Sequence, residues 1–227
     1  MTATLSNHCI ADARPIAASV AATLKKTAKE RDRTAGTPEY EVRLLREAGL
    51  LPLVVPAEEI LGPPAKPAGA AATFLGIFGL ILLSHIFLGI GEGAFEEAIA
   101  YTRTQTRPWL TSGVDSAVQD PYLQRHYGEL WAKLQGAQAL ADRVTAQAQQ
   151  AWDKGDALTH EERGEIAIAA AAAKSLATET GLAITNRMFE LMGARSTATR
   201  YAFDRPWRDL RTLSLHDPLD YKTARNR

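Results

Sequence analysis

One stretch of this sequence constrains the fold more than any other: the segment 120–154, in which apolar or small side chains recur at alternating intervals of four and three residues. This spacing keeps one stripe on a single face of a helix of about nine turns. Asp120 and Pro121 suit the N-cap and the first helical position, and Gly155 suits the C-terminal end. Such a stripe must pack against at least one helix of similar length. Its members are Leu123, Tyr127, Leu130, Leu134, Ala137, Ala141, Val144 and Ala148.

A second long helix is predicted between residue 73 and about residue 107. It begins in an apolar run, 67–91, that contains no charged residue. The run is long enough to span a bilayer, so Phe74–Gly91 is either a membrane helix or a helix buried in a bundle or oligomer. Its glycines, and the continuation of the helical pattern into Glu92 and Glu96, favour the buried helix. We expect Ser84 and His85 to form a core pair, with the Ser84 hydroxyl bonded back along the helix.

Composition narrows the class of protein. Lysine plus arginine number 26 and aspartate plus glutamate number 26, which gives zero net charge and argues against a nucleic-acid-binding protein. The single Cys9 cannot form an internal disulfide, and the N-terminal residues show no signal-peptide pattern. We therefore expect a cytoplasmic protein that binds neither nucleic acid nor membrane.

The remaining patterns complete an all-α fold. An amphipathic segment over 10–33 and a shorter one capped by Thr37 predict an N-terminal helical hairpin in residues 1–61. The proline-rich segment 62–72 is typical of a linker. Thr159 and Glu162 have capping-box spacing and open an alanine-rich helix that ends at Gly193. We predict an antiparallel helical bundle in residues 73–227, with three long helices, a shorter one near 196–201, then a turn and a final segment.

Two polar clusters are candidates for a functional site. Arg103, Gln105 and Arg107 gather at a predicted helix end, where guanidinium and amide donors suit a phosphate group, although a solvated helix end is the alternative. His216 directly precedes Asp217–Pro218, a turn-like context that would hold its imidazole in a fixed place. No set of His, Cys or carboxylate residues has metal-ligand spacing, so we expect no metal site.

Three motifs resemble those of the acyl-CoA dehydrogenase-like flavoproteins, and most closely the branch of flavin-dependent sulfur-compound monooxygenases of the dibenzothiophene and sulfone desulfurisation types. They are TRTQTRPWLTSGVD at 102–115, DPYLQRHYGELW at 120–131 and WRDLRTLSLHDPLDYK at 207–222. Residues 10–57 also resemble the opening helices of the family's N-terminal domain. The resemblance implies a C-terminal four-helix bundle at the core of a homotetramer, and a flavin cofactor, FMN or FAD. It also implies that the linker 62–72 stands in place of the central β-domain.

The resemblance assigns roles to four residues. Arg103 and Gln105 match the Arg and Gln that reach a flavin phosphate, often on a neighbouring subunit. Gly193 matches part of a glycine pair that approaches the cofactor. His216 matches the second histidine of an H-x-x-H pair beside the flavin ring, where it would act as an acid/base or hydrogen-bonding group.

The sequence departs from the family pattern at three positions and in one region. Leu213, Ala194 and Thr106 stand where the first histidine, the second glycine and an aromatic residue are expected. The central β-domain has no counterpart in the chain. Two functions are therefore open: a flavin-dependent monooxygenase acting with reduced flavin and O2 on a small apolar substrate, or a non-catalytic helical oligomerisation scaffold. Both predict a homo-oligomer, a tetramer or a dimer.

Overall fold

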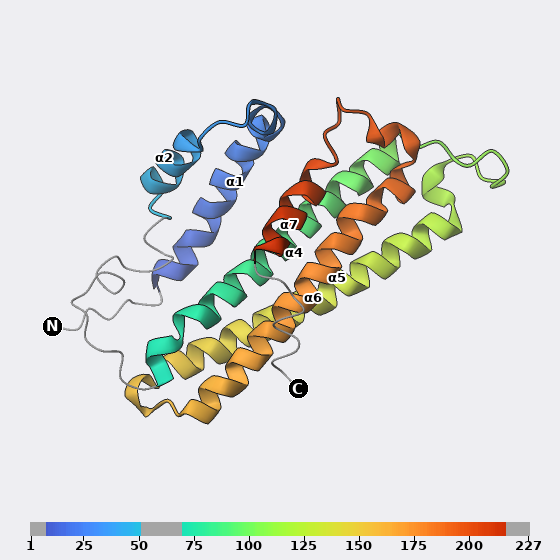
Figure 1. Cartoon of the computed structure of the whole chain (residues 1–227). Coiled ribbons are helices and arrows are strands. Elements are labelled where there is room, and N and C mark those ends of the chain that lie inside the picture. Colours follow the sequence, from blue (N-terminus) through green and yellow to red (C-terminus); the bar gives the residue numbers. More distant parts are fainter. Residues whose placement is uncertain (1–7, 51–69, 217–227) are drawn as a thin grey trace. The chain divides into compact units, whose positions relative to one another are not determined.

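The computed structural model of this chain describes residues 8–50 and 70–216, and the regular elements in these ranges are all helical (Figure 1). The predicted all-α class is therefore confirmed. The chain divides into two compact units, Met1–Lys66 and Pro67–Arg227. Most of the predicted linker 62–72 lies outside the described residues, as do Asp217 and Pro218.

The first unit contains the predicted hairpin, formed by α1 (His8–Thr34) and α2 (Glu39–Glu47). An ion pair between Arg31 and Glu41 joins the two helices, and Arg31 also donates to the carbonyl of Leu24 at 2.7 Å. The hydrogen bond from Arg31 is the main reason why the pKa of Glu41 is lowered. The expected Thr37 cap is wrong: Pro38 is the N-cap residue of α2, and no side chain caps the helix.

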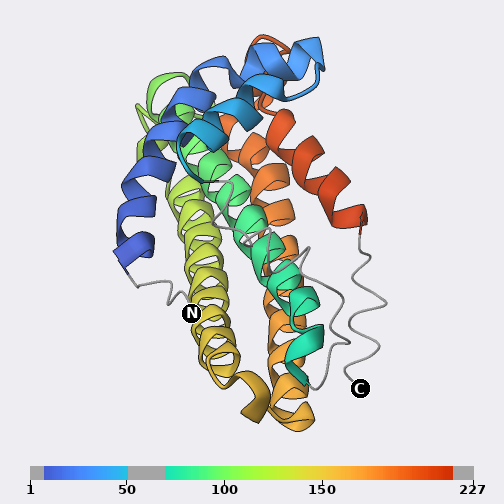
Figure 2. The same cartoon turned by 90° about the vertical axis from the view of Figure 1, so that its left-hand side faces the viewer.

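The second unit is a bundle of three long helices, α4 (Leu75–Thr104), α5 (Pro121–Trp152) and α6 (His160–Met192), which lie side by side in Figure 2. Asp120 caps α5 by accepting a hydrogen bond from the Tyr122 amide at 2.8 Å. The capping box of Thr159 with Glu162 is also present. The predicted stripe of α5 is buried from Leu130 to Ala148 and half-buried at its first two positions. Short 3-10 turns connect the helices, η2 (Ala70–Thr73), η3 (Ala117–Gln119), η4 (Gly155–Ala157) and η5 (Ala194–Thr197).

A fourth helix, α7 (Arg205–Leu215), occupies the segment for which only a turn and a final segment of no assigned structure were expected. The helix expected near 196–201 is instead the single turn η5, because the chain must reverse there before α7 begins. Leu210 of α7 is fully buried and lies against Gly181 of α6. A Cβ at Gly181 would lie 2.5 Å from Leu210 Cδ1 and 3.0 Å from the Phe87 carbonyl, so only glycine permits this approach of α4, α6 and α7.

Helix α4 is buried on one face only. By length and composition alone it is apolar enough to cross a membrane, and 33% of its most apolar 18-residue window is buried within the chain. The buried Ser84 hydroxyl donates to the Leu80 carbonyl at 2.8 Å, as expected. The expectation for His85 is wrong, because this side chain is exposed rather than part of the core, and its Nε2 lies 2.9 Å from Thr145 Oγ1 of α5.

The bundle has two ends of different character. The turn end comprises the start of α4, the end of α5 and the start of α6, around the residues 152–163. The loop end comprises the end of α4, the start of α5 and the end of α6, and there the loop 105–116 projects from the helices (Figure 1, green). The motifs selected from the sequence at 102–131 and 193 lie at the loop end.

Candidate functional site

The loop end carries three donor side chains that make no hydrogen bond or ion pair within the part of the chain that the structure describes. They are Arg103 in the last turn of α4, Gln105 at its C-cap, and Arg107 two residues further on, all of them exposed. Helix α4 ends at Thr104 rather than near 107, because Pro108 disfavours helical backbone at the residue before it, Arg107. The charge of Arg103 complements the negative end of the helix dipole, yet its guanidinium donors remain available to an anion.

Two threonines join this helix end to the end of α6. The Thr106 hydroxyl donates to the Met192 carbonyl at 3.1 Å, and the Thr102 hydroxyl lies 3.5 Å from the Leu191 carbonyl. Both acceptors are carbonyls in the last turn of α6, which lack partners within their own helix. These contacts bring Gln105 next to the turn at Gly193, although the two are far apart in the sequence.

Gly193 ends α6 with φ 81° and ψ 169°, a backbone conformation that is essentially restricted to glycine. No heavy atom lies within 4 Å of the position that a Cβ would occupy, so space is open beside its backbone. Ala194, at the position of the second glycine expected from the resemblance, begins η5 and is exposed. An anionic group could approach the chain at this turn without meeting a side chain.

An aromatic cluster of Tyr101, Tyr201 and Phe203 joins the end of α4 to the segment between η5 and α7, and the sequence patterns did not indicate it. The Tyr101 ring meets the other two rings edge-on at centroid distances of 5.2 and 5.4 Å. Arg200 lies over the Tyr201 ring at 4.6 Å and donates to its hydroxyl at 3.2 Å, which is the main cause of the lowered pKa of Tyr201. Burial, by contrast, raises the pKa of Tyr101. The cluster fixes the chain between η5 and α7.

His216 lies apart from this cluster within one chain. Helix α7 starts near the loop end, where Phe203 contacts Tyr101, and passes Gly181 in the middle of α6 at Leu210. At about 1.5 Å per residue, its eleven residues place His216 roughly 16 Å along the bundle. The His216 side chain is exposed at the C-terminal end of α7.

The structure gives a reason for one departure from the expected H-x-x-H pair. Leu213 is half-buried and packs against the core that includes Leu210 and Ile184. An apolar side chain therefore stabilises the bundle at the position where the resemblance leads to a histidine. Ser214, also buried, donates to the Arg211 carbonyl at 2.8 Å and is not directed to His216. Within residues 8–50 and 70–216, no group of three His, Cys, Asp or Glu side chains could hold a metal ion.

Comparisons with known proteins identify the helical bundle. Residues 81–221 match the family described as "Acyl-CoA dehydrogenase, C-terminal domain". The chain is 46% identical over 177 residues to a dibenzothiophene monooxygenase of Mycolicibacterium goodii, which covers 76% of this chain and 43% of that protein. It is 45% identical over 164 residues to the probable FMNH2-dependent monooxygenase SfnC of Pseudomonas putida, which covers 72% of this chain and 42% of that protein.

Solved structures agree with these relatives. The methanesulfinate monooxygenase MsuC of Pseudomonas fluorescens superposes with a TM-score of 0.69 at 46% identity, over 72% of this chain and 42% of that one. The complex of TdsC from Paenibacillus sp. A11-2 with FMN and indole gives 0.66 at 40% identity, over 69% of this chain and 40% of that one. The chain thus spans less than half the length of these relatives. It belongs to the acyl-CoA dehydrogenase family, and the part that matches is the C-terminal helical domain.

Proposed function

We propose that this chain is the helical domain of a flavin-dependent monooxygenase that acts with reduced FMN and O2 on a small, apolar substrate. Relatives of 45–46% identity are named as monooxygenases, and one of them as FMNH2-dependent. The observation that carries the proposal is the set of unpartnered donors at the loop end. Arg103, Gln105 and Arg107 can hold an anionic group beside the open backbone at Gly193.

These residues fit the phosphate end of a flavin. A guanidinium and a primary amide present several N–H donors, and hydrogen bonds from a cation to phosphate are among the strongest in proteins. When bound, the flavin would supply the reaction of O2 with the substrate, which no side chain can perform. The role of Arg103 and Gln105 is to bind and orient that cofactor.

His216 is proposed as the acid/base or hydrogen-bonding group. An exposed imidazole can donate or accept a proton at either nitrogen, depending on its tautomer. Because His216 and Arg103 lie at different places along one bundle, the proposal assigns them to different flavins or to different subunits around one flavin. This follows the resemblance, in which the phosphate-binding Arg often comes from a neighbouring subunit.

We further propose that a second copy of the chain covers the outer face of α4. Leu75, Leu82 and Ile86 are exposed there, at 61%, 48% and 37%. Gly79 and Gly89 have nothing within 4 Å of a Cβ position, so another helix could approach closely. A dimer or tetramer buries this surface, which would otherwise face water.

Light scattering tests the proposed oligomer. The unsubstituted chain should form an oligomer, and the substitution Leu82→Glu should dissociate it. A monomer for the unsubstituted chain would contradict this part of the proposal.

FMN binding provides the first test of the flavin proposal. We expect the chain to quench FMN fluorescence on titration, and Arg103→Gln to weaken the Kd by at least about tenfold through loss of one charge-assisted contact. Arg143→Gln, an exposed arginine of α5 outside the loop end, is the matched control and should leave the Kd unchanged. If the chain binds no FMN, the alternative function, a non-catalytic oligomerisation scaffold, is favoured.

Turnover provides the second test. With reduced FMN, O2 and dibenzothiophene as a trial substrate, His216→Ala should abolish product formation while the oligomer stays intact. Unchanged turnover in this variant would remove His216 from the mechanism.

A further inference from the structure

A pocket of about 280 Å³ opens at the loop end between α4, η3 and α5. Its walls are apolar and come from three elements: Ile99 of α4, Ala117 and Val118 of η3, and Leu123 of α5. Ala117 is buried, and Gln124 fixes η3 by donating to the Val118 carbonyl at 2.9 Å. The volume lies near the lower limit for ligand sites, which suits a molecule with the size of a single substituted ring.

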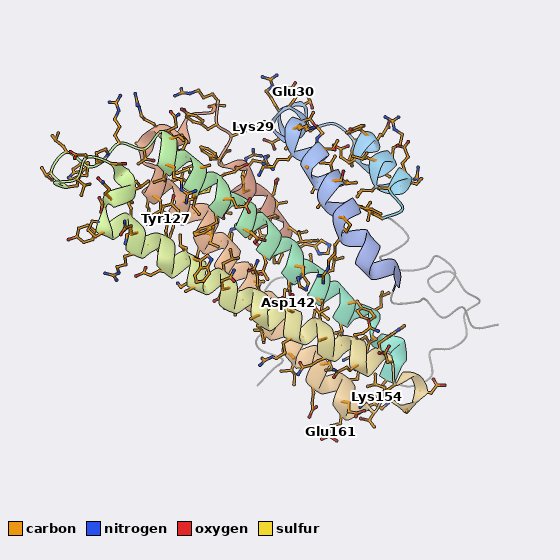
Figure 3. The ribbon with its side chains drawn as sticks, turned by 180° about the vertical axis from the view of Figure 1, so that it is seen from behind. Lys29, Glu30, Tyr127, Asp142, Lys154 and Glu161 are labelled. Atoms are coloured by element: carbon orange, nitrogen blue, oxygen red, sulfur yellow. The ribbon has the colours of Figure 1, made fainter. Side chains whose placement is uncertain are left out.

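Four polar side chains line this pocket and contribute its hydrogen-bonding groups: Thr102, Arg103, Gln124 and Tyr127. Arg103 is the single cation of the lining and has no partner among the described residues. Tyr127, labelled in Figure 3, is half-buried in α5, and its hydroxyl lies 2.7 Å from Thr102 Oγ1, which is buried in α4. Of the residues assigned above to flavin binding, only Arg103 lines the pocket.

The hydroxyl pair can present a donor to a ligand. The contact from Thr102 Oγ1 to the Leu191 carbonyl is long, at 3.5 Å, and therefore weak. When Thr102 donates instead to Tyr127, the phenolic proton of Tyr127 becomes available to a group in the pocket. Burial raises the pKa of Tyr127, so the phenol keeps this proton at neutral pH.

We propose that this pocket is a binding site for a small organic monoanion, a carboxylate or similar oxyanion on an apolar body. Arg103 pairs with the anionic head, Tyr127 donates a hydrogen bond to it, and Ile99, Val118 and Leu123 contact the body. A neutral analogue loses the ion pair, and a free inorganic anion loses the apolar contacts. A dianion is disfavoured, because the lining contains only one cation.

Benzoate and its neutral isostere benzamide test the site, with binding measured by calorimetry on the full chain. We expect benzoate to bind at least about tenfold more tightly than benzamide, because one charge-assisted hydrogen bond separates them. Tyr127→Phe should weaken benzoate by about fivefold through the loss of one hydrogen bond. Arg103→Gln should remove the preference for the anion, and Arg143→Gln should retain it.

A substitution that fills the pocket with a larger side chain distinguishes benzoate binding from FMN binding. Val118 is 43% exposed in η3, so Val118→Trp can be accommodated at the pocket rim and should block benzoate while the FMN Kd stays unchanged. Leu123→Trp is a second filling variant, and circular dichroism verifies the helices of both. Equal affinity for benzoate and benzamide would overturn the proposal, and so would unchanged benzoate binding in both Tyr127→Phe and Val118→Trp. Neither outcome affects the flavin proposal, which is decided by the FMN titration.

Discussion

The two ends of the bundle use their polar groups differently. At the turn end, Thr159 and Glu162 satisfy each other's backbone amides, Lys154 pairs with Glu162, and Arg163 donates to Thr73 at 2.9 and 3.1 Å. At the loop end, the donors of Arg103, Gln105 and Arg107 have no partner within the described chain. A helix end that needs only to be stable satisfies its groups internally. The loop end leaves strong donors available, which is the arrangement expected of a ligand site.

Apolar side chains show the same contrast. At the turn end Phe74 is fully buried and meets Phe78 and Trp152 at centroid distances of 5.1 and 5.9 Å. In the loop 105–116, Trp109 and Leu110 are 75% and 95% exposed. At the turn end Phe74 is therefore part of the core, whereas the loop 105–116 presents Trp109 and Leu110 as apolar surface next to the unpaired cations of the loop end. The comparison predicts that substitutions at the turn end change stability alone, and that those at the loop end change ligand binding as well.

The largest effect is expected for Phe74→Ala. Removal of a fully buried ring should lower the free energy of unfolding by about 3–5 kcal/mol in urea titrations and leave the FMN Kd unchanged. Tyr122→Ala removes a 73% exposed ring of α5 and should cost less than about 0.5 kcal/mol. A large loss of FMN affinity in folded Phe74→Ala would break the proposed division between the ends.

Gly193→Ala and Gly164→Ala compare two glycines at which an added Cβ would meet no neighbouring atom. At Gly193 the backbone strain of a non-glycine residue should cost about 1–3 kcal/mol and weaken FMN binding. Gly164, in the first turns of α6, has helical backbone, and Gly164→Ala should instead stabilise by about 0.5–1 kcal/mol. Thermal or urea unfolding of the two variants measures both values. Equal shifts of the same sign would show that backbone conformation at Gly193 is unimportant.

Substitutions of two threonines, one at each end of the bundle, give a matched pair of variants that each lose one hydrogen bond. Thr106→Val removes the hydrogen bond to Met192, and Thr159→Ala removes the cap of α6; each should cost about 1 kcal/mol of stability. Only Thr106→Val should also weaken FMN, by severalfold, because it releases Gln105 from the turn at Gly193. If both variants bind FMN like the unsubstituted chain, the joint between α4 and α6 does not position the site.

The smallest effect concerns acid stability at the turn end. Hydrogen bonds from Lys154 and then from Thr159 lower the pKa of Glu162 from 4.5 to about 2. Because the folded-state pKa is depressed, the stabilisation is present above pH 4.5 and is lost as the pH falls from 4.5 toward about 2. Glu162→Gln should flatten the dependence of the unfolding midpoint on pH in this window. Since the Glu162 carboxylate is exposed, added salt should reduce the difference between the pH profiles of the unsubstituted chain and Glu162→Gln. An unchanged pH profile in Glu162→Gln would contradict the stabilising role of the Glu162 carboxylate.

Local patterns in the sequence were enough to predict the long helices. The stripe of α5, the Asp120 cap, the capping box at Thr159 and the end of α6 at Gly193 depend on neighbouring residues only, and the structure confirms each. Helix α7 was not predicted, although Trp207, Leu210 and Leu213 recur at helical spacing, and its place in the bundle depends on the packing of Leu210 against Gly181. His85 was wrongly expected in the core, because an apolar helix does not by itself reveal which face is buried.

For the site, the sequence by itself determined which side chains can bind a phosphate. The motif resemblance selected Arg103, Gln105, Gly193 and His216 as the candidate site residues. Only the tertiary structure decided that the ends of α4 and α6 meet through Thr106 and Met192, and that His216 lies elsewhere along the bundle. It alone revealed the pocket beside Tyr127. The physical reason is that donor chemistry belongs to a residue, whereas proximity arises from helix packing between segments more than eighty residues apart.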